Sequence, residues 1–124
     1  MRSPSLLASF RFALQGIVHA FRTQRNFKIH TAITGVVIVV GLWVGVSAEQ
    51  WAILTLAIAL VFMAELINTA LEAVVDHVAP EFHVLAKVAK DCAAGAVFVA
   101  AMLAVVVGLL VLGPRILAVT IARP

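Results

Sequence analysis

Three long stretches without a charged residue constrain what this chain can fold into. Residues 31–46, 51–64 and 92–112 contain no Asp, Glu, Lys or Arg. A helix needs about 20 apolar residues to cross the hydrocarbon core of a bilayer, and each stretch approaches that length with its flanks. We therefore expect membrane spans at residues 28–47, 51–75 and 92–112, with Gly113-Pro114 ending the third span.

The composition supports a membrane protein over a soluble one. Hydrophobic residues make up 64% of the 124 residues, well above the proportion in soluble domains. A chain this short cannot hide so much apolar surface in its own core, so lipid and other copies of the chain must cover the rest. We expect an all-α integral membrane protein with a single membrane domain over residues 1–124.

Residues 5–25 have the pattern of an amphipathic surface helix. Apolar residues recur at steps of three and four, whereas Arg11, Gln15 and Arg22 lie roughly on the opposite side. The apolar stretches here are too short to span, so we expect a helix that lies in the membrane interface. An ordinary soluble amphipathic helix is the alternative interpretation.

Positive charge predicts the orientation of the chain. The segment before residue 29 holds five Lys or Arg residues, the turn at 47–50 holds none, and residues 76–91 hold two. We therefore expect the N-terminus and a loop at 76–89 on the cytoplasmic side, with the helix of span 51–75 extending into the cytoplasm. The net charge of +3 comes mostly from the N-terminal segment, so we interpret it as topology and headgroup contact and expect no nucleic acid partner.

An acidic stripe follows the second apolar stretch. Glu65, Asn68, Glu72 and Asp76 are spaced by three, four and four residues. At about 100° per residue they fall within roughly an 80° arc of one helix. Carboxylates at membrane depth are costly and are functional candidates by default. The alternative is a solvated helix end that carries a few acids.

These residue types are those that phosphoryl transfer requires. The reaction needs a divalent cation on the phosphates, a positive side chain for the spreading charge and a carboxylate for the hydroxyl proton. Glu72 suits Mg²⁺, Lys90 suits a phosphate, and Glu65 lies roughly 10 Å deeper along the helix, where a lipid hydroxyl would be. The glycine-rich motifs of the common nucleotide folds are absent. From the residues alone, a small proton-coupled transporter or relay subunit with an intramembrane carboxylate remains an alternative.

Residues 65–76 resemble the signature of the bacterial diacylglycerol kinase family, Glu-x-aliphatic-Asn-Ser/Thr-small-aliphatic-Glu-x-x-Val-Asp. Residues 80–83 and 89–91 match the family's second block, without a gap in the spacing between the two blocks. Residues 25–30, 83–87 and 90–96 look more like the undecaprenol kinase branch, because Ala93-Ala-Gly95 stands where the diacylglycerol branch typically has Gly-Ser-Ala.

The resemblance implies a lipid kinase of the bacterial inner membrane. It implies a homotrimer with active sites built between neighbouring subunits, ATP and Mg²⁺ as co-substrate and cofactor, and undecaprenol or diacylglycerol as the acceptor at the cytoplasmic face. Residue by residue, it implies Glu65 as catalytic base, Asn68 as the residue that positions the base or the hydroxyl, and Glu72 as metal ligand. It further implies nucleotide contacts, near the phosphates from Lys90 and Asp91 and at the nucleoside end from Glu81 and His83.

Some assignments have a simpler alternative. His83 could cap or pack the loop, and Asp76 could pair with Lys87 instead of taking part in catalysis. Where the family usually has a second glutamate ligand for the metal, this chain has Gln24, whose carbonyl can ligate Mg²⁺ but brings no charge. A catalytically weakened member of the family is therefore a further alternative.

Overall fold

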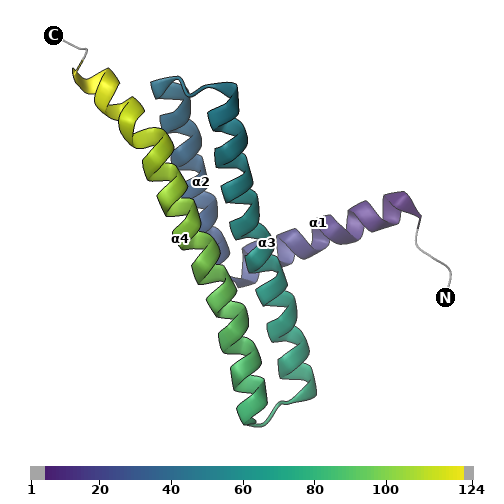
Figure 1. The fold of residues 1–124 in the computed structure, drawn as a ribbon. Helices are drawn as coiled ribbons and strands as arrows, with labels where there is room; N and C mark the ends of the chain where they lie inside the picture. Colours follow the sequence, from purple (N-terminus) through teal and green to yellow (C-terminus); the bar gives the residue numbers. More distant parts are fainter. Residues whose placement is uncertain (1–4, 122–124) are drawn as a thin grey trace.

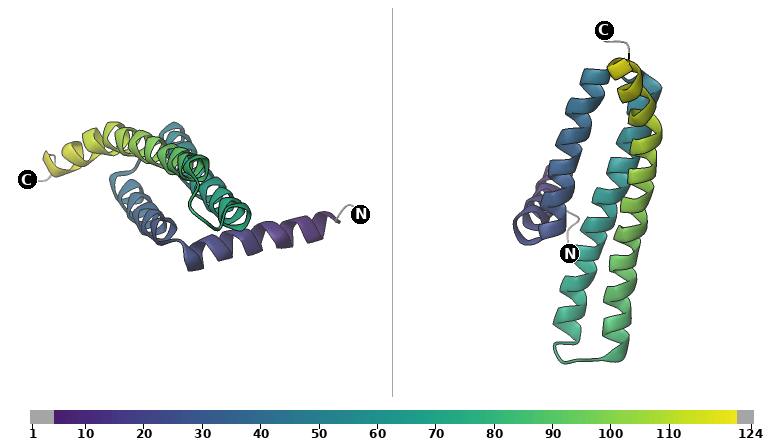
Figure 2. Two further views of the ribbon diagram at one scale, coloured as in Figure 1. Left: turned by 90° about the horizontal axis from the view of Figure 1, so that it is seen from below. Right: turned by 90° about the vertical axis from the view of Figure 1, so that its left-hand side faces the viewer.

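Four helices make up the computed structural model, which describes residues 5–121. They are α1 (Leu6–Thr23), α2 (Arg25–Val44), α3 (Ala48–Val78) and α4 (Val84–Ile121). Helices α2, α3 and α4 run side by side as a bundle, whereas α1 leaves the bundle at a steep angle (Figures 1 and 2). The three bundle helices are each long and apolar enough to cross a membrane. The prediction of an all-α chain with three candidate spans is confirmed.

Helix α1 touches the rest of the chain only along part of its length. The Ser5 hydroxyl accepts a hydrogen bond from the Ala8 amide at 3.3 Å and caps its start. Ala20, near the junction with α2, is its one buried residue, whereas Leu6 and Phe10 are 81% and 68% exposed. The α3–α4 hairpin extends beyond the level of the α1–α2 junction, so its tip projects past α1 (Figure 1).

A tight turn joins α2 to α3. Gly45 has a φ of 68°, a left-handed conformation that glycine adopts without strain, and it ends α2. Ser47 and Gln50 then form a reciprocal capping box that starts α3. One turn before the end of α2, Gly41 lets the helix approach the Trp51 ring. A Cβ at this position would lie 2.6 Å from Cη2 of Trp51, too close for van der Waals contact.

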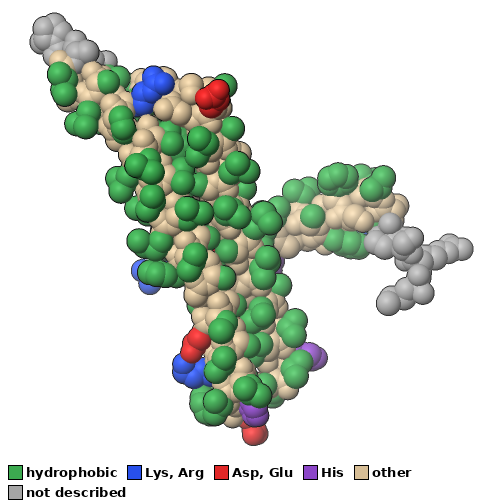
Figure 3. All heavy atoms as spheres, in the orientation of Figure 1, with side chains coloured by type: hydrophobic (Ala, Val, Ile, Leu, Met, Phe, Trp, Pro, Cys, Tyr) green, Lys and Arg blue, Asp and Glu red, His purple; other side chains and the backbone are tan. Residues whose placement is uncertain are grey.

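The core is small and lies at the α2–α3 turn. Val44, Val46, Leu54, Val111 and Leu112 form its buried cluster. Elsewhere α4 packs most closely along α3, and large apolar side chains are exposed on all four helices. Hydrophobic side chains cover the visible face, and charged ones gather toward the two ends of the bundle (Figure 3). Such a surface needs an apolar environment around it.

The expected end of the third helix at Gly113-Pro114 is wrong. Helix α4 continues through Pro114 to Ile121. A proline inside a helix removes one backbone hydrogen bond, which packing around an apolar helix can tolerate. Here Ile116 and Val119 pack against the core cluster, and Arg115 Nη1 lies 3.5 Å from the carbonyl oxygen of Gly45. These contacts attach the first turns after the proline to the α2–α3 turn, while the C-terminal end of α4 bends away from the bundle (Figures 1 and 2).

The connection between α3 and α4 is also shorter than the predicted loop at 76–89. Helix α3 continues to Val78 and α4 begins at Val84, which leaves residues 79–83 between them. Ala79 ends α3 with its amide bonded to the Val75 carbonyl at 2.8 Å. Of the polar residues that suggested a long loop, Asp76 and Lys87 lie on the helix ends, whereas Glu81 and His83 lie in the connection.

Candidate active site

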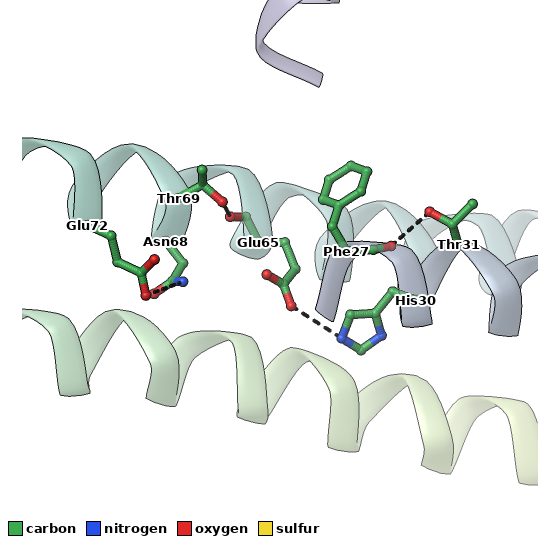
Figure 4. A network of polar contacts seen from close by, with 7 residues as sticks. All are labelled: Phe27, His30, Thr31, Glu65, Asn68, Thr69 and Glu72. Carbon is green, nitrogen blue, oxygen red and sulfur yellow. Dashed lines mark hydrogen bonds and ion pairs between the residues drawn. The ribbon is translucent and has the colours of Figure 1, made fainter. Parts of the chain in front are cut away.

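Glu65 lies in the middle of α3 and is almost completely enclosed, with 1% of its surface exposed. Phe27 of α2 and Phe62 of α3 meet edge to face beside it, with ring centroids 5.0 Å apart. The carboxylate Oε1 lies 3.4 Å from Nε2 of His30 on α2 (Figure 4) and has no hydrogen-bond partner among residues 5–121. A buried, under-satisfied carboxylate of this kind is uncommon, which makes it a candidate reactive group.

Asn68 and Glu72 continue the polar row along α3. Asn68 Nδ2 donates a hydrogen bond to Oε1 of Glu72 at 3.2 Å, while its own Oδ1 is buried without a partner. Both side chains point toward α4, as Glu65 does, whereas Thr69 points away and bonds the Glu65 carbonyl at 2.8 Å (Figure 4). The amide of Asn68 thus positions Glu72 in this structure, and not Glu65.

The predicted nucleotide-binding residues Glu81, His83, Lys90 and Asp91 meet at the tip of the α3–α4 hairpin. A cavity of about 430 Å³ lies there, and its polar lining residues are Asp76, Glu81, His83, Lys87, Lys90 and Asp91. Lys90 Nζ donates to Oδ1 of Asp76 at 2.9 Å, and Lys87 pairs with Asp91. The predicted pairing of Asp76 with Lys87 is therefore wrong, because the helical register places Lys90 opposite Asp76.

Lys90 is the group in this cavity that suits an anionic ligand, although the charged lining holds three acids against two lysines. The hydrogen bond to Asp76 raises the pKa of the Lys90 ammonium group above its ordinary value. Lys90 is therefore fully charged at physiological pH, and only one of its three N–H donors is used by Asp76. His83 Nδ1 accepts the backbone amide of Leu85 at 3.2 Å and so caps the start of α4, which leaves its other ring nitrogen for a ligand.

The metal ligands of one chain are few. The described helices bring no three His, Cys, Asp or Glu side chains close enough to hold a metal ion. Gln24 lies at the junction of α1 and α2, and across residues 5–121 no hydrogen bond joins its side chain to Glu72. Mg²⁺ commonly binds through one or two carboxylates together with substrate phosphates and water. Glu72, oriented by Asn68, fits that pattern as a single carboxylate ligand.

His30 was missed by the sequence analysis. It lies 35 positions before Glu65, and no local pattern links a histidine at the start of one span to an acid at the end of the next. The sequence did contain one indication of a role for His30, which is its position directly before the uncharged stretch 31–46. An ionisable side chain at such a position needs a polar partner.

The sequence matches known proteins along almost its whole length. Residues 11–112 match the family description "Prokaryotic diacylglycerol kinase". A protein named diacylglycerol kinase from Synechocystis sp. is 49% identical over 120 residues, which are 96% of this chain and 69% of that protein. A protein named undecaprenol kinase from Bacillus subtilis is 44% identical over 108 residues, 87% of this chain and 88% of that protein.

A third relative, named diacylglycerol kinase, comes from Escherichia coli K12 and is 30% identical over 95 residues, 77% of this chain and 78% of that protein. The match to the family covers far more than half of the chain, and it includes the acidic row of α3 and the tip of the hairpin. The chain therefore belongs to the prokaryotic diacylglycerol kinase family and is a membrane lipid kinase.

Proposed function

We propose that this lipid kinase transfers the γ-phosphoryl group of ATP to the hydroxyl of undecaprenol at the cytoplasmic face of the bacterial inner membrane. The observation that carries the proposal is the row of Glu65, Asn68 and Glu72, which leads from an enclosed carboxylate on α3 toward the charged cavity at Lys90. Glu72 follows Glu65 by seven positions along the helix, which separates the two acids by roughly 10 Å. A lipid hydroxyl and a nucleotide phosphate can approach such a row from opposite ends.

Each side chain has a role that its surroundings support. Glu65 accepts the proton of the lipid hydroxyl, and the unpartnered Oδ1 of Asn68 accepts a hydrogen bond from the hydroxyl or from water. Glu72 holds Mg²⁺, which neutralises charge on the phosphates when bound. Lys90 binds the phosphates, with Asp91 beside it, while Glu81 and His83 contact the nucleoside from the exposed end of the cavity.

Undecaprenol is the preferred acceptor for two reasons. Ala93 and Gly95, two positions of the segment in which this chain departs from the diacylglycerol branch, line an apolar groove of about 620 Å³ between α3 and α4 that reaches Asn68. The relative from Bacillus subtilis also has the name undecaprenol kinase. Diacylglycerol is the second candidate, since the relative from Synechocystis has the name diacylglycerol kinase.

We propose a homotrimer as the working form, with α1 on the cytoplasmic surface of the membrane. Within residues 5–121, Glu72 is the one carboxylate that we assign to the metal, and the groove beside Asn68 is open, which leaves room for a neighbouring subunit to complete the site. The exposed apolar residues of α1 and its steep angle to the bundle suit a helix lying in the interface. The hairpin tip would then project into the cytoplasm, where ATP is.

The test is ATP-dependent phosphorylation by the purified protein in mixed micelles. Undecaprenol and diacylglycerol are offered separately at a series of Mg²⁺ concentrations, with Glu65→Gln as the catalytic variant. Glu49→Gln is the matched control, because Glu49 lies in the first turn at the other end of the same helix. Faster turnover of undecaprenol that Glu65→Gln abolishes and Glu49→Gln preserves supports the proposal. A folded wild-type protein without turnover of either lipid refutes it.

A further inference from the structure

His30 is the one residue of another helix that the structure places against the Glu65 carboxylate. Its Nε2 lies 3.4 Å from Oε1, its side chain is 20% exposed, and the Glu65 side chain is only 2% exposed. Within residues 5–121, Oε1 has no hydrogen-bond partner, and His30 is the residue with which it forms an ion pair. A bare carboxylate oxygen and a bare ring nitrogen would repel each other at this distance, which requires a proton on one of them.

Because Glu65 is enclosed, the position of this proton determines whether its carboxylate can be ionised. An ionised carboxylate in apolar surroundings is strongly disfavoured unless a donor or a positive charge compensates it. The other ionisable side chains of the neighbouring helices include Arg11, His19 and Arg22 on α1, Arg25 and Lys28 on α2, and Glu72 on α3. Within residues 5–121 none of them forms an ion pair or a hydrogen bond with the Glu65 carboxylate. Helix α4 adds only Cys92 between residues 92 and 112. Compensation therefore depends on His30.

Resting on the proposed function of Glu65 as base, we infer that His30 is its positioning residue. In this structure Nε2 and Oε1 are 3.4 Å apart without a hydrogen bond between them. In the reacting site the imidazole turns so that Nε2–H donates to Oε1, which keeps the carboxylate ionised and leaves its second oxygen for the lipid hydroxyl. Phe27, one turn earlier on α2, fixes the helix against Phe62 and so holds the histidine at this height. The Gln24 junction is six residues away, so this role is separate from metal binding.

The test compares His30→Leu, which removes the donor, with His30→Gln, which keeps an N–H donor at similar length. His19→Leu is the control, because His19 lies on α1 and not against Glu65. Lipid phosphorylation is measured as a function of pH in mixed micelles. We expect kcat to fall on the order of 10²-fold in His30→Leu, with an unchanged KM for ATP, and to recover most of that loss in His30→Gln. The pH below which activity is lost should also move upward in His30→Leu, since the carboxylate loses its donor.

Equal pH profiles for wild type, His30→Leu and His19→Leu would overturn the inference while the kinase reaction itself stood. A wild-type protein without turnover of either lipid would overturn the proposed function, and this inference with it. If the leucine variant does not fold, ¹⁵N NMR of the four histidines of the chain gives the answer without turnover. We expect His30 of the wild type to carry its proton on Nε2 and to change its signal in Glu65→Gln. A proton on Nδ1 alone, or no response to Glu65→Gln, would refute the assignment.

Discussion

Lys90 Nζ lies 2.9 Å from Oδ1 of Asp76 and joins the first turns of α4 to the last turns of α3. The two side chains are 39% and 64% exposed, so the pair stands in water at the mouth of the hairpin cavity. Exposed pairs of this kind contribute little to folding stability. The pair matters for the position of Lys90, because Asp76 holds the ammonium group at the wall of the cavity that we assign to ATP.

Replacing Lys90 by Met should lower kcat/KM for ATP by about 100-fold, because the phosphates lose a positive partner. Lys90→Arg should keep part of the activity. Asp76→Asn should cost less than Lys90→Met, about 10-fold, because the lysine stays charged but is held less firmly. Steady-state kinetics with varied ATP measures all three variants, and Lys28→Met on α2 is the control for loss of one positive charge. A larger loss in Asp76→Asn than in Lys90→Met would contradict these roles.

The same pair defines a pH prediction. Because the folded-state pKa of Lys90 is raised above the ordinary 10.5, its contribution is fully present below that value and is lost only as the pH rises through the raised value. Between pH 7 and 9, the KM for ATP should therefore not rise on account of this lysine. A wild-type KM for ATP that rises within this window, with the rise absent in Lys90→Arg, would mean that Lys90 is titrating and that Asp76 does not raise its pKa.

Gly41 offers a prediction about folding. A Cβ at this position would lie 2.6 Å from Cη2 and 2.9 Å from Cζ2 of Trp51, so alanine forces the indole or α2 to move. We expect Gly41→Ala to destabilise the protein by about 1–3 kcal/mol through overpacking. Gly35→Ala is the matched control on the same helix, because its Cβ would meet nothing within 4 Å. Unfolding in mixed micelles with increasing SDS, followed by Trp fluorescence, compares the two variants. Equal stability would show that the ring has room to move.

The helices could be predicted from the sequence, but the contacts between them could not. Uncharged stretches predict spans because the bilayer imposes the length of an apolar helix. The acidic row on α3 follows from helical periodicity alone, since Glu65, Asn68 and Glu72 share one face whatever packs against it. These features depend on neighbouring residues along one helix.

The errors all concern register between helices or the tolerance of a helix for a breaker. Asp76 meets Lys90 and not Lys87, because the length of the 79–83 connection sets the register of α4 against α3. Pro114 looked like a helix end, yet packing of the following turns on the core cluster keeps α4 continuous.

The role of Asn68 in orienting Glu72 can be tested by comparing its substitution with that of the adjacent Thr69. Asn68→Ala removes the donor to Glu72 and the buried Oδ1, so we expect kcat to fall on the order of 10²-fold and the Mg²⁺ concentration for half-maximal rate to rise. Thr69→Ala is the control, since Thr69 is equally buried on α3 but points away from the row. Comparable losses in the two variants would indicate a general packing defect at this level of α3.

Gln24 stands where the family resemblance implies a glutamate as second metal ligand, and its replacement tests whether this position contacts the metal. Glutamate at this position adds a negative charge that Mg²⁺ favours over an amide oxygen. If Gln24 reaches the metal in the assembled protein, Gln24→Glu should lower the Mg²⁺ concentration for half-maximal rate several-fold, and raise kcat if the wild-type metal site is weak. Thr23→Glu places the same charge one residue earlier, on the last residue of α1, and controls for a general attraction of cations. Mg²⁺ titrations of turnover for both variants give the comparison. An equal response to both glutamates would mean that position 24 lies outside the metal site and that Glu72 binds the ion without it.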